Sequence, residues 1–330
     1  MLQMPIRRVA TALLMTVALM PATPRAEVQS AFPSRPVTIM VPYAAGGGTD
    51  AVARTLAKAL SVHWNQSVIV ENRTGADGWI GTQWVLSQPA DGHVILIQLN
   101  SMMLWRWSAP EHKFDVTKDM RVVTRVQNSP MVAAVRADVK ADDLRTFLDT
   151  CSSASKPCSF GGATVSANLV SRQLMDLGGV RNGASVAYKG TAPMMTDLLG
   201  GHIDLALISA NQAVPMTTEG KVKSLAVGLD KRYERLPHSP TFEEAGFPII
   251  ATTWYGLMVR QATPTAVFNA IVDGIQKVSK QPEVLAAIES QGGIPVFDSP
   301  QSFAASIQRE AAALAPLGEK YLASPDTLRK

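Results

Sequence analysis

Three times along this sequence an apolar, strand-like segment runs into a short loop that opens a helix-like segment. The three loops cover residues 44–50, 74–80 and 161–166. Strands that alternate with helices predict an α/β fold with a largely parallel sheet. In open sheets of this kind, ligands bind at the carboxyl ends of the strands. The alternation therefore predicts both the fold class and the place of a ligand site.

The hydrophobic pattern locates most of the expected elements. Val52, Leu56 and Leu60 recur at helical spacing, and Thr49 or Asp50 is expected to cap that helix. The expected strands are residues 36–42, 67–70, 93–97, 131–135, 158–160, 184–187, 203–208, 222–227 and 254–259. The expected helices are residues 49–63, 80–87, 142–150, 166–177 and 193–199, with three more beginning near residues 264, 282 and 299.

The first 26 residues resemble an export signal. Arg7 and Arg8 precede an apolar segment at residues 9–20, and small residues follow at Ala22 and Ala26. A basic start, a short apolar core and a small residue at the cut site are typical of a secretory signal peptide. We expect cleavage after Ala26, with Ala22 as an alternative cut site and an uncut membrane anchor as a second alternative. The mature protein is then expected in the periplasm.

The charge of the chain gives no support to nucleic-acid binding. The formal net charge is +4, and Arg7, Arg8 and Arg25 supply three of these four charges without any acidic residue in the same segment. A protein that binds phosphate backbones needs a clustered basic surface. The mature chain has no such surplus, and we expect no nucleic-acid partner.

The two cysteines, Cys151 and Cys158, are separated by a turn-like segment. An oxidising compartment permits a disulfide between them, and the turn allows the approach that the bond requires. The alternative is two free thiols. The spacing differs from Cys-x-x-Cys, so a redox site is not expected.

The sequence contains none of the catalytic or metal-binding motifs that would mark an enzyme. The glycine-rich loop lacks the Lys-Ser/Thr ending of a nucleotide-binding P-loop, and there is no G-x-S-x-G or H-E-x-x-H motif. The acids Asp50, Asp77 and Asp204 either converge in one site or serve as local caps and turns. Lys189 is either a ligand cation or a solvated charge. We expect no enzyme activity, no metal and no cofactor.

Two of the three loops are glycine-rich and enter helices, which favours a small anion as the ligand. A helix N-terminus stabilises an anion by about 0.3–1 kcal/mol, and each hydrogen bond to a charged group adds roughly 1.5–3 kcal/mol. Micromolar binding needs about 8 kcal/mol. One loop is therefore insufficient, whereas two loops that face each other across a cleft are sufficient for a small carboxylate.

Seven motifs in order resemble the substrate-binding proteins of tripartite tricarboxylate transporters, the Bug or TctC-like family. The opening motif is RPVTIMVPYAAGGGTD at residues 35–50. The other six lie at residues 70–82, 89–92, 188–193, 196–201, 240–246 and 254–257.

The resemblance implies a type II periplasmic-binding-protein fold, in which two lobes joined by crossing strands enclose one ligand. It places lobe one at residues 27–130 plus 256–330 and lobe two at residues 131–255. It also implies a solute-binding protein whose ligand is a di- or tricarboxylate, an amino acid or an aromatic acid. The ligand shell carried over by motif is Tyr43, Ala44, Ala45, Gly46, Thr49, Ile80, Asn100, Ser101, Thr164, Ser166, Asn168 and Lys189.

By the same resemblance, the protein is expected to be a monomer that closes around its ligand and docks on a two-component membrane permease. The alternative is a sensor module that presents its closed form to a membrane receptor such as a sensor kinase. Two positions depart from the family pattern. Ile208-Ser209 stands where an Asp is frequent, and Trp79 stands where a smaller polar residue is common. Both departures favour an apolar or aromatic acid.

Overall fold

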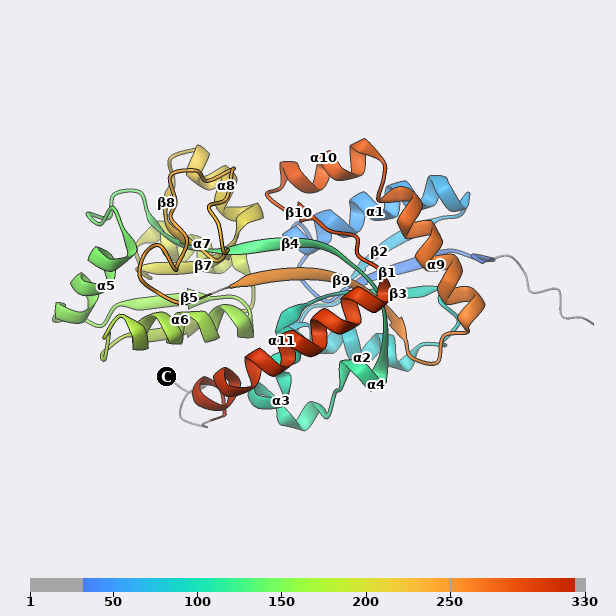
Figure 1. Ribbon diagram of the computed structural model, residues 1–330, viewed down its shortest axis with the longest axis horizontal. Coiled ribbons are helices and arrows are strands. Elements are labelled where there is room, and N and C mark those ends of the chain that lie inside the picture. The colour runs from blue at the N-terminus through green and yellow to red at the C-terminus, as the bar shows by residue number, and fades with distance from the viewer. Residues whose placement is uncertain (1–31, 250, 324–330) are drawn as a thin grey trace, which may run out of the picture. The chain divides into compact units, whose positions relative to one another are not determined.

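The computed structural model describes residues 32–249 and 251–323. The expected signal peptide at residues 1–26 lies outside them. The described chain contains a ten-stranded sheet in the order β2-β1-β3-β9-β4-β7-β5-β6, with β8 and β10 also paired to β4 (Figure 1). The strands are β1 (Val37–Val41), β2 (Val68–Asn72), β3 (Val94–Leu99), β4 (Met120–Arg136), β5 (Ser159–Gly162), β6 (Ala184–Ala187), β7 (Leu205–Ser209), β8 (Val222–Val227), β9 (Thr252–Arg260) and β10 (Ile294–Pro295).

The sheet has a parallel part at each end and an antiparallel centre. We call the part with β1, β2 and β3 the first half and the part with β5, β6 and β7 the second half. Strand β1 pairs in parallel with β2 and β3, and β5 pairs in parallel with β6 and β7. The central strands β4 and β9 run antiparallel to each other and to their outer neighbours. The α/β prediction is confirmed, and the parallel pairing is confined to the two halves.

Strand β4 belongs to both halves. Its residues up to Pro130 pair with β9, and from Met131 onward it pairs with β7 and β8. The sequence predicted only the apolar second part of this strand. The first part was missed because the polar run from Gln127 to Ser129 breaks the apolar pattern, although Gln127 and Ser129 are fully buried.

Eleven helices accompany the sheet in the described residues. They are α1 (Gly48–Trp64), α2 (Trp79–Ser87), α3 (Trp105–Ser108), α4 (Val116–Asp119), α5 (Leu144–Ser153), α6 (Val165–Leu177), α7 (Thr191–Gly200), α8 (Ala210–Thr218), α9 (Thr265–Val278), α10 (Pro282–Ser290) and α11 (Pro300–Tyr321). Short 3-10 turns are η1 (Ala76–Gly78), η2 (Asn100–Leu104) and η3 (Pro110–His112). None of the helices in these ranges has both the length and the apolarity to cross a bilayer.

Each half has its own hydrophobic core. In the first half, Ile39 of β1, Leu56 of α1 and Ile271 of α9 are completely buried in one cluster. In the second half, Phe160 of β5 and Leu174 of α6 belong to a separate cluster. Full burial of such a side chain stabilises the fold by roughly 1.5–3 kcal/mol. A smaller apolar cluster joins the halves, in which Leu104 of η2, Leu169 of α6 and Leu322 after α11 are buried together.

Helix α11 connects the two halves a second time (Figure 1). Near its start, Phe303 and Ile307 are buried in a cluster of the first half. Near its end, Lys320 Nζ and the Tyr321 hydroxyl both contact Asp176 Oδ2 of α6, at 2.6 and 2.7 Å. Pro316 lies inside the helix between these two anchors.

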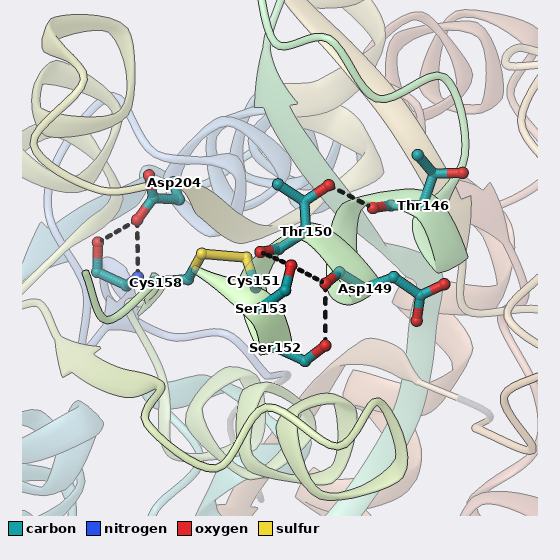
Figure 2. The surroundings of a disulfide bond; sticks show 9 residues. Thr146, Asp149, Thr150, Cys151, Ser152, Ser153, Cys158 and Asp204 are labelled. Carbon is teal, nitrogen blue, oxygen red and sulfur yellow. Dashed lines mark hydrogen bonds between the residues drawn. A yellow bond between two sulfur atoms is a disulfide. The ribbon is translucent and has the colours of Figure 1, made fainter. Parts of the chain in front are cut away.

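Cys151 and Cys158 form a disulfide that connects the end of α5 to the start of β5 (Figure 2). Their Cα atoms are 5.5 Å apart. The neighbouring Ser159 donates its backbone N–H and its hydroxyl to Asp204 Oδ2, at 2.8 and 2.9 Å. The bond is therefore a local connection at the end of β5 opposite the candidate binding loop.

The start of α1 differs from the prediction that Thr49 or Asp50 caps this helix. The cap residue is Gly47, which makes no side-chain cap bond, and Thr49 and Asp50 are buried in the first turn. The Asp50 carboxylate instead reaches back and accepts the Gly46 N–H at 2.9 Å. The residue that stabilises the helix start thus lies inside the helix.

Candidate ligand-binding site

The two halves meet at the first residue of α1. A Cβ atom on Gly48 would lie 1.7 Å from Asn211 Nδ2 of α8 and 2.9 Å from the Tyr255 hydroxyl of β9. Distances below 3.0 Å essentially do not occur for real Cβ contacts, so any larger residue here would displace the Asn211 side chain. The sequence predicted neither α8 nor Asn211, because Pro215 interrupts the helix pattern and no motif marks the asparagine.

Asn211 is the centre of a small polar network at this junction. Its Nδ2 donates to the Tyr255 hydroxyl at 3.2 Å, and its Oδ1 accepts from the Ser209 hydroxyl and, at 3.4 Å, from the Ser129 hydroxyl. Burial raises the pKa of Tyr255, although Asn211, Ser209 and Thr49 oppose that shift. The network connects α1 and α8 to strands β4 and β9, and burial, not the network, keeps the phenol neutral.

The loop before α1 is held by Asp50. One carboxylate oxygen accepts from Gly46 N–H and Arg54 Nε, both at 2.9 Å, and the other accepts from Asn72 Nδ2 at 2.9 Å. Burial would raise the pKa of Asp50, but these hydrogen bonds outweigh it and hold the pKa below its ordinary value. The Gly46 N–H is therefore used inside the loop.

A second chain of polar contacts lies beneath the loop. The Tyr43 hydroxyl donates to Gln98 Oε1 at 2.5 Å, and Gln98 Nε2 donates to the Thr82 hydroxyl at 3.0 Å. Burial, and then the negative charge of Asp77, raise the pKa of Tyr43 well above its ordinary value. Tyr43 is thus a neutral donor fixed toward the interior.

Asp77 lies where η1 of the first half faces the start of α6. Its backbone is in the left-handed region, with φ of 51°. Both carboxylate oxygens are enclosed and accept no hydrogen bond. Burial raises the pKa of Asp77 to about 7, and the nearby Ser101 hydroxyl, Val165 N–H and Trp105 indole reduce the shift. This carboxylate has donors around it and is bonded to none of them.

The second half contributes the loop that enters α6. Thr164 caps the helix by accepting the Ala167 N–H at 3.2 Å, and its hydroxyl lies 3.1 Å from that of Ser166. The Oδ1 of Asn168 is buried without a hydrogen-bond partner. A Cβ on Gly162 would lie 2.3 Å from that oxygen, so the glycine makes room for the amide.

The predicted ligand residues do not all gather at the junction. Tyr43 and Ser101 lie around Asp77, Thr49 contacts the Tyr255 network, and Thr164, Ser166 and Asn168 lie at the start of α6. The predicted residues that are largely exposed are Ala44, Ala45, Gly46, Ile80 and Lys189. The side-chain amide of Asn100 donates to Thr252 O and to Glu310 Oε1, both at 2.8 Å.

The three aspartates named from the sequence do not converge. Asp50 holds its loop, Asp204 binds Ser159 at the far end of β5, and only Asp77 is left without a partner. Among residues 32–249 and 251–323, no group of three or more His, Cys, Asp or Glu side chains is placed to hold a metal ion. A hollow of about 320 Å³ between α4, α9 and α11 involves none of the junction residues.

Comparison with known proteins points to one family. Residues 52–321 match the model of the tripartite tricarboxylate transporter family receptor. A protein from Pseudomonas sp. (strain P51), described as the UPF0065 protein in the tcbD-tcbE intergenic region, is 31% identical over 287 residues, covering 84% of this chain and 83% of that protein.

Two solved structures share the fold closely. The periplasmic binding protein BugD is 29% identical, with a TM-score of 0.81 over 88% of this chain and 98% of BugD. MatC (Rpa3494) from Rhodopseudomonas palustris, solved with bound malate, is 26% identical, with a TM-score of 0.80 over 87% of this chain and all of MatC.

Proposed function

We propose that this chain, which belongs to the family of tripartite tricarboxylate transporter receptors, captures one small carboxylate between its two halves for a membrane transporter. The family consists of solute-binding receptors and not of enzymes. A relative of the same fold holds malate, a dicarboxylate. That this chain binds a small carboxylate, and that it delivers the carboxylate to a membrane transporter, are both part of the proposal.

One observation carries the proposal. The first residue of α1, Gly48, and the first residue of α6, Val165, both lie where the two halves meet. Helix N-termini present unpaired N–H groups and a partial positive charge, which favours a carboxylate. Two helix N-termini at one junction can together supply the roughly 8 kcal/mol that micromolar binding needs, whereas one loop cannot.

The ligand shell that we propose extends from these two helix starts. It keeps the residues expected from the sequence, which are Tyr43, Ala44, Ala45, Gly46, Thr49, Ile80, Asn100, Ser101, Thr164, Ser166, Asn168 and Lys189. Asn211 and Tyr255 are added because their side chains lie against Gly48. The Asp50 network keeps the loop before α1 in one conformation, which lowers the entropy lost on binding.

We propose that the halves are lobes that close by a hinge motion, with residues 27–130 plus 256–330 in one lobe and residues 131–255 in the other. The pairing of β4 changes at Met131, which supports the first of these boundaries. Ligand contacts from both lobes stabilise the closed state relative to the open one. We further propose export to the periplasm through a signal peptide cleaved after Ala26, and a monomeric state.

Isothermal titration with a panel of mono-, di- and tricarboxylates and amino acids tests the proposal. We expect one site per chain for at least one class of carboxylate. The proposal fails if the folded protein gives neither heat nor a thermal shift with the whole panel.

A glycine variant locates the site. Gly48→Ala places a methyl group against Asn211 and Tyr255, so we expect at least a tenfold loss of affinity with an unchanged fold. Gly200→Ala is the matched control, because its Cβ meets only the exposed ring of His202, at 3.1 Å. Equal affinities in the two variants would place the ligand elsewhere.

A further inference from the structure

Asp77 is the one enclosed side chain at the junction whose charge has no partner on the described part of the chain. Both of its oxygens are enclosed, and neither accepts a hydrogen bond. Ionised carboxylates are rarely buried unless they are paired. Buried polar groups without partners in native proteins call for a specific explanation, such as a ligand or water that completes them.

The surroundings of Asp77 show which partner is missing. The Ser101 hydroxyl and Trp105 Nε1 face it and are themselves without hydrogen-bond partners. These groups and the Val165 N–H lie close enough to lower the pKa of the carboxylate, although none of them completes a hydrogen bond to it. Asp77 therefore faces neutral donors, and no positively charged group is among the causes of its pKa shift.

The ionisable groups near Asp77 bring no compensating positive charge. The Tyr43 phenol lies close enough for the two groups to affect each other's charge, and it is neutral. The His112 ring lies edge-on to Trp105, with centroids 5.9 Å apart, and stacks on Trp79 at 4.4 Å, and burial lowers the pKa of His112. No ion pair within residues 32–249 and 251–323 includes Asp77.

We propose that Asp77 selects the ligand by binding a protonated amine, so that the preferred solute is an amino acid, with a carboxylate at the helix starts and an ammonium at Asp77. This rests on the proposed function, because it requires a carboxylate in the same cleft. A ligand that places a second carboxylate at Asp77 would bury two like charges together. An ammonium group instead supplies three donors and the opposite charge.

Matched ligand pairs test the selection directly. L-Leucine with 4-methylpentanoate and L-glutamate with glutarate differ within each pair only by the amino group. In isothermal titration at pH 8, we expect the wild-type protein to bind the amine-bearing member of the better-bound pair at least tenfold more tightly. In Asp77→Asn the preference should fall below about threefold.

Asp77→Asn is expected to fold, because asparagine tolerates the left-handed conformation at this position. Asp204→Asn removes the same charge from the far end of β5 and serves as the control, with its preference unchanged. The pH dependence of ligand affinity distinguishes an ionised Asp77 that accepts from an ammonium from a protonated Asp77 that donates to a carboxylate. A carboxylate that binds an ammonium loses the preference as the pH falls from 8 to 6, whereas a protonated Asp77 that donates to a second ligand carboxylate gives tighter glutarate binding at pH 6.

The outcomes are distinct. A preference for the deaminated members, or a preference that survives in Asp77→Asn, overturns the selection by Asp77 and leaves carboxylate capture intact. If no member of either pair and no other carboxylate binds the folded wild-type protein, the proposed function itself is wrong and the selection falls with it.

Discussion

The two halves bring different chemistry to the junction between them. The first half places two carboxylates there, Asp50 and Asp77, whereas the second half presents the hydroxyls of Thr164 and Ser166 and the amide of Asn168. Both halves use the same strand–loop–helix arrangement. The difference means that the carboxylates near the junction belong to the first half.

The two aspartates also differ from each other. Asp50 accepts three hydrogen bonds, and its pKa is lowered despite its burial. Asp77 accepts none, and burial raises its pKa to about 7. The same side chain is a structural support at position 50 and is left without a hydrogen-bond partner at position 77, and the number of bound donors makes the difference.

The largest change in the free energy of unfolding is expected from Asp77→Asn in the absence of ligand. The folded protein holds a proton that the unfolded chain releases between pH 4 and 7, so wild-type stability falls as the pH rises through this range. The variant lacks this loss and should be more stable by ~2–4 kcal/mol at pH 8, with little difference near pH 4. Urea unfolding at several pH values measures the free energy of unfolding of both proteins. The same pH dependence in the two proteins would contradict the prediction.

Asp50→Ala should change the stability in the opposite direction, so that the variant is less stable than the wild type. Removing a buried carboxylate that holds three donors is expected to cost about 2–3 kcal/mol at pH 7. Because the folded pKa is lowered, this contribution is present above the ordinary pKa of Asp and is lost as the pH falls through the folded value. Denaturant unfolding at pH 7 and pH 3 checks both statements. Arg54→Met removes only the exposed ion-pair partner and should cost less.

Thr164→Ala tests the second half and should have the smallest effect. Loss of the N-cap of α6 is expected to cost about 1 kcal/mol, without pH dependence, since the hydroxyl does not titrate. Ser299→Ala removes the equivalent cap of α11, which accepts the Ser302 N–H at 3.1 Å, and should cost a similar amount. Only Thr164→Ala should also weaken ligand binding. A loss of affinity in both variants would show that the effect does not come from the cleft.

Local patterns predicted the elements better than the contacts between them. The strand at Val222–Val227 and the helix start at Pro282 agree with the sequence pattern, because each follows from its own residues. The first part of β4 and the whole of α8 were missed, because polar residues and Pro215 hide elements that only tertiary packing stabilises.

The site was predictable only in outline. Motifs selected the two helix starts, because glycine and capping residues mark a loop from its own sequence. Gly48 and Tyr255 lie within motifs but were not assigned to the ligand shell, and Asn211 lies in no motif, because their mutual contacts join residues more than forty positions apart. Asp77 was named only as one of three acids, since its lack of partners is a property of the packed structure.

Helix α11 has a mechanical consequence for the protein. One end is fixed by Phe303 in the core of the first half, and the other is bonded through Tyr321 and Lys320 to Asp176 of the second half. Pro316 removes one backbone hydrogen bond between these points, the one to the carbonyl of Ala312. Any separation of the halves must either break the bonds to Asp176 or bend the helix at this weakened turn. Helix α11 therefore restrains the two halves relative to each other, and bending it would contribute to the work of any separation.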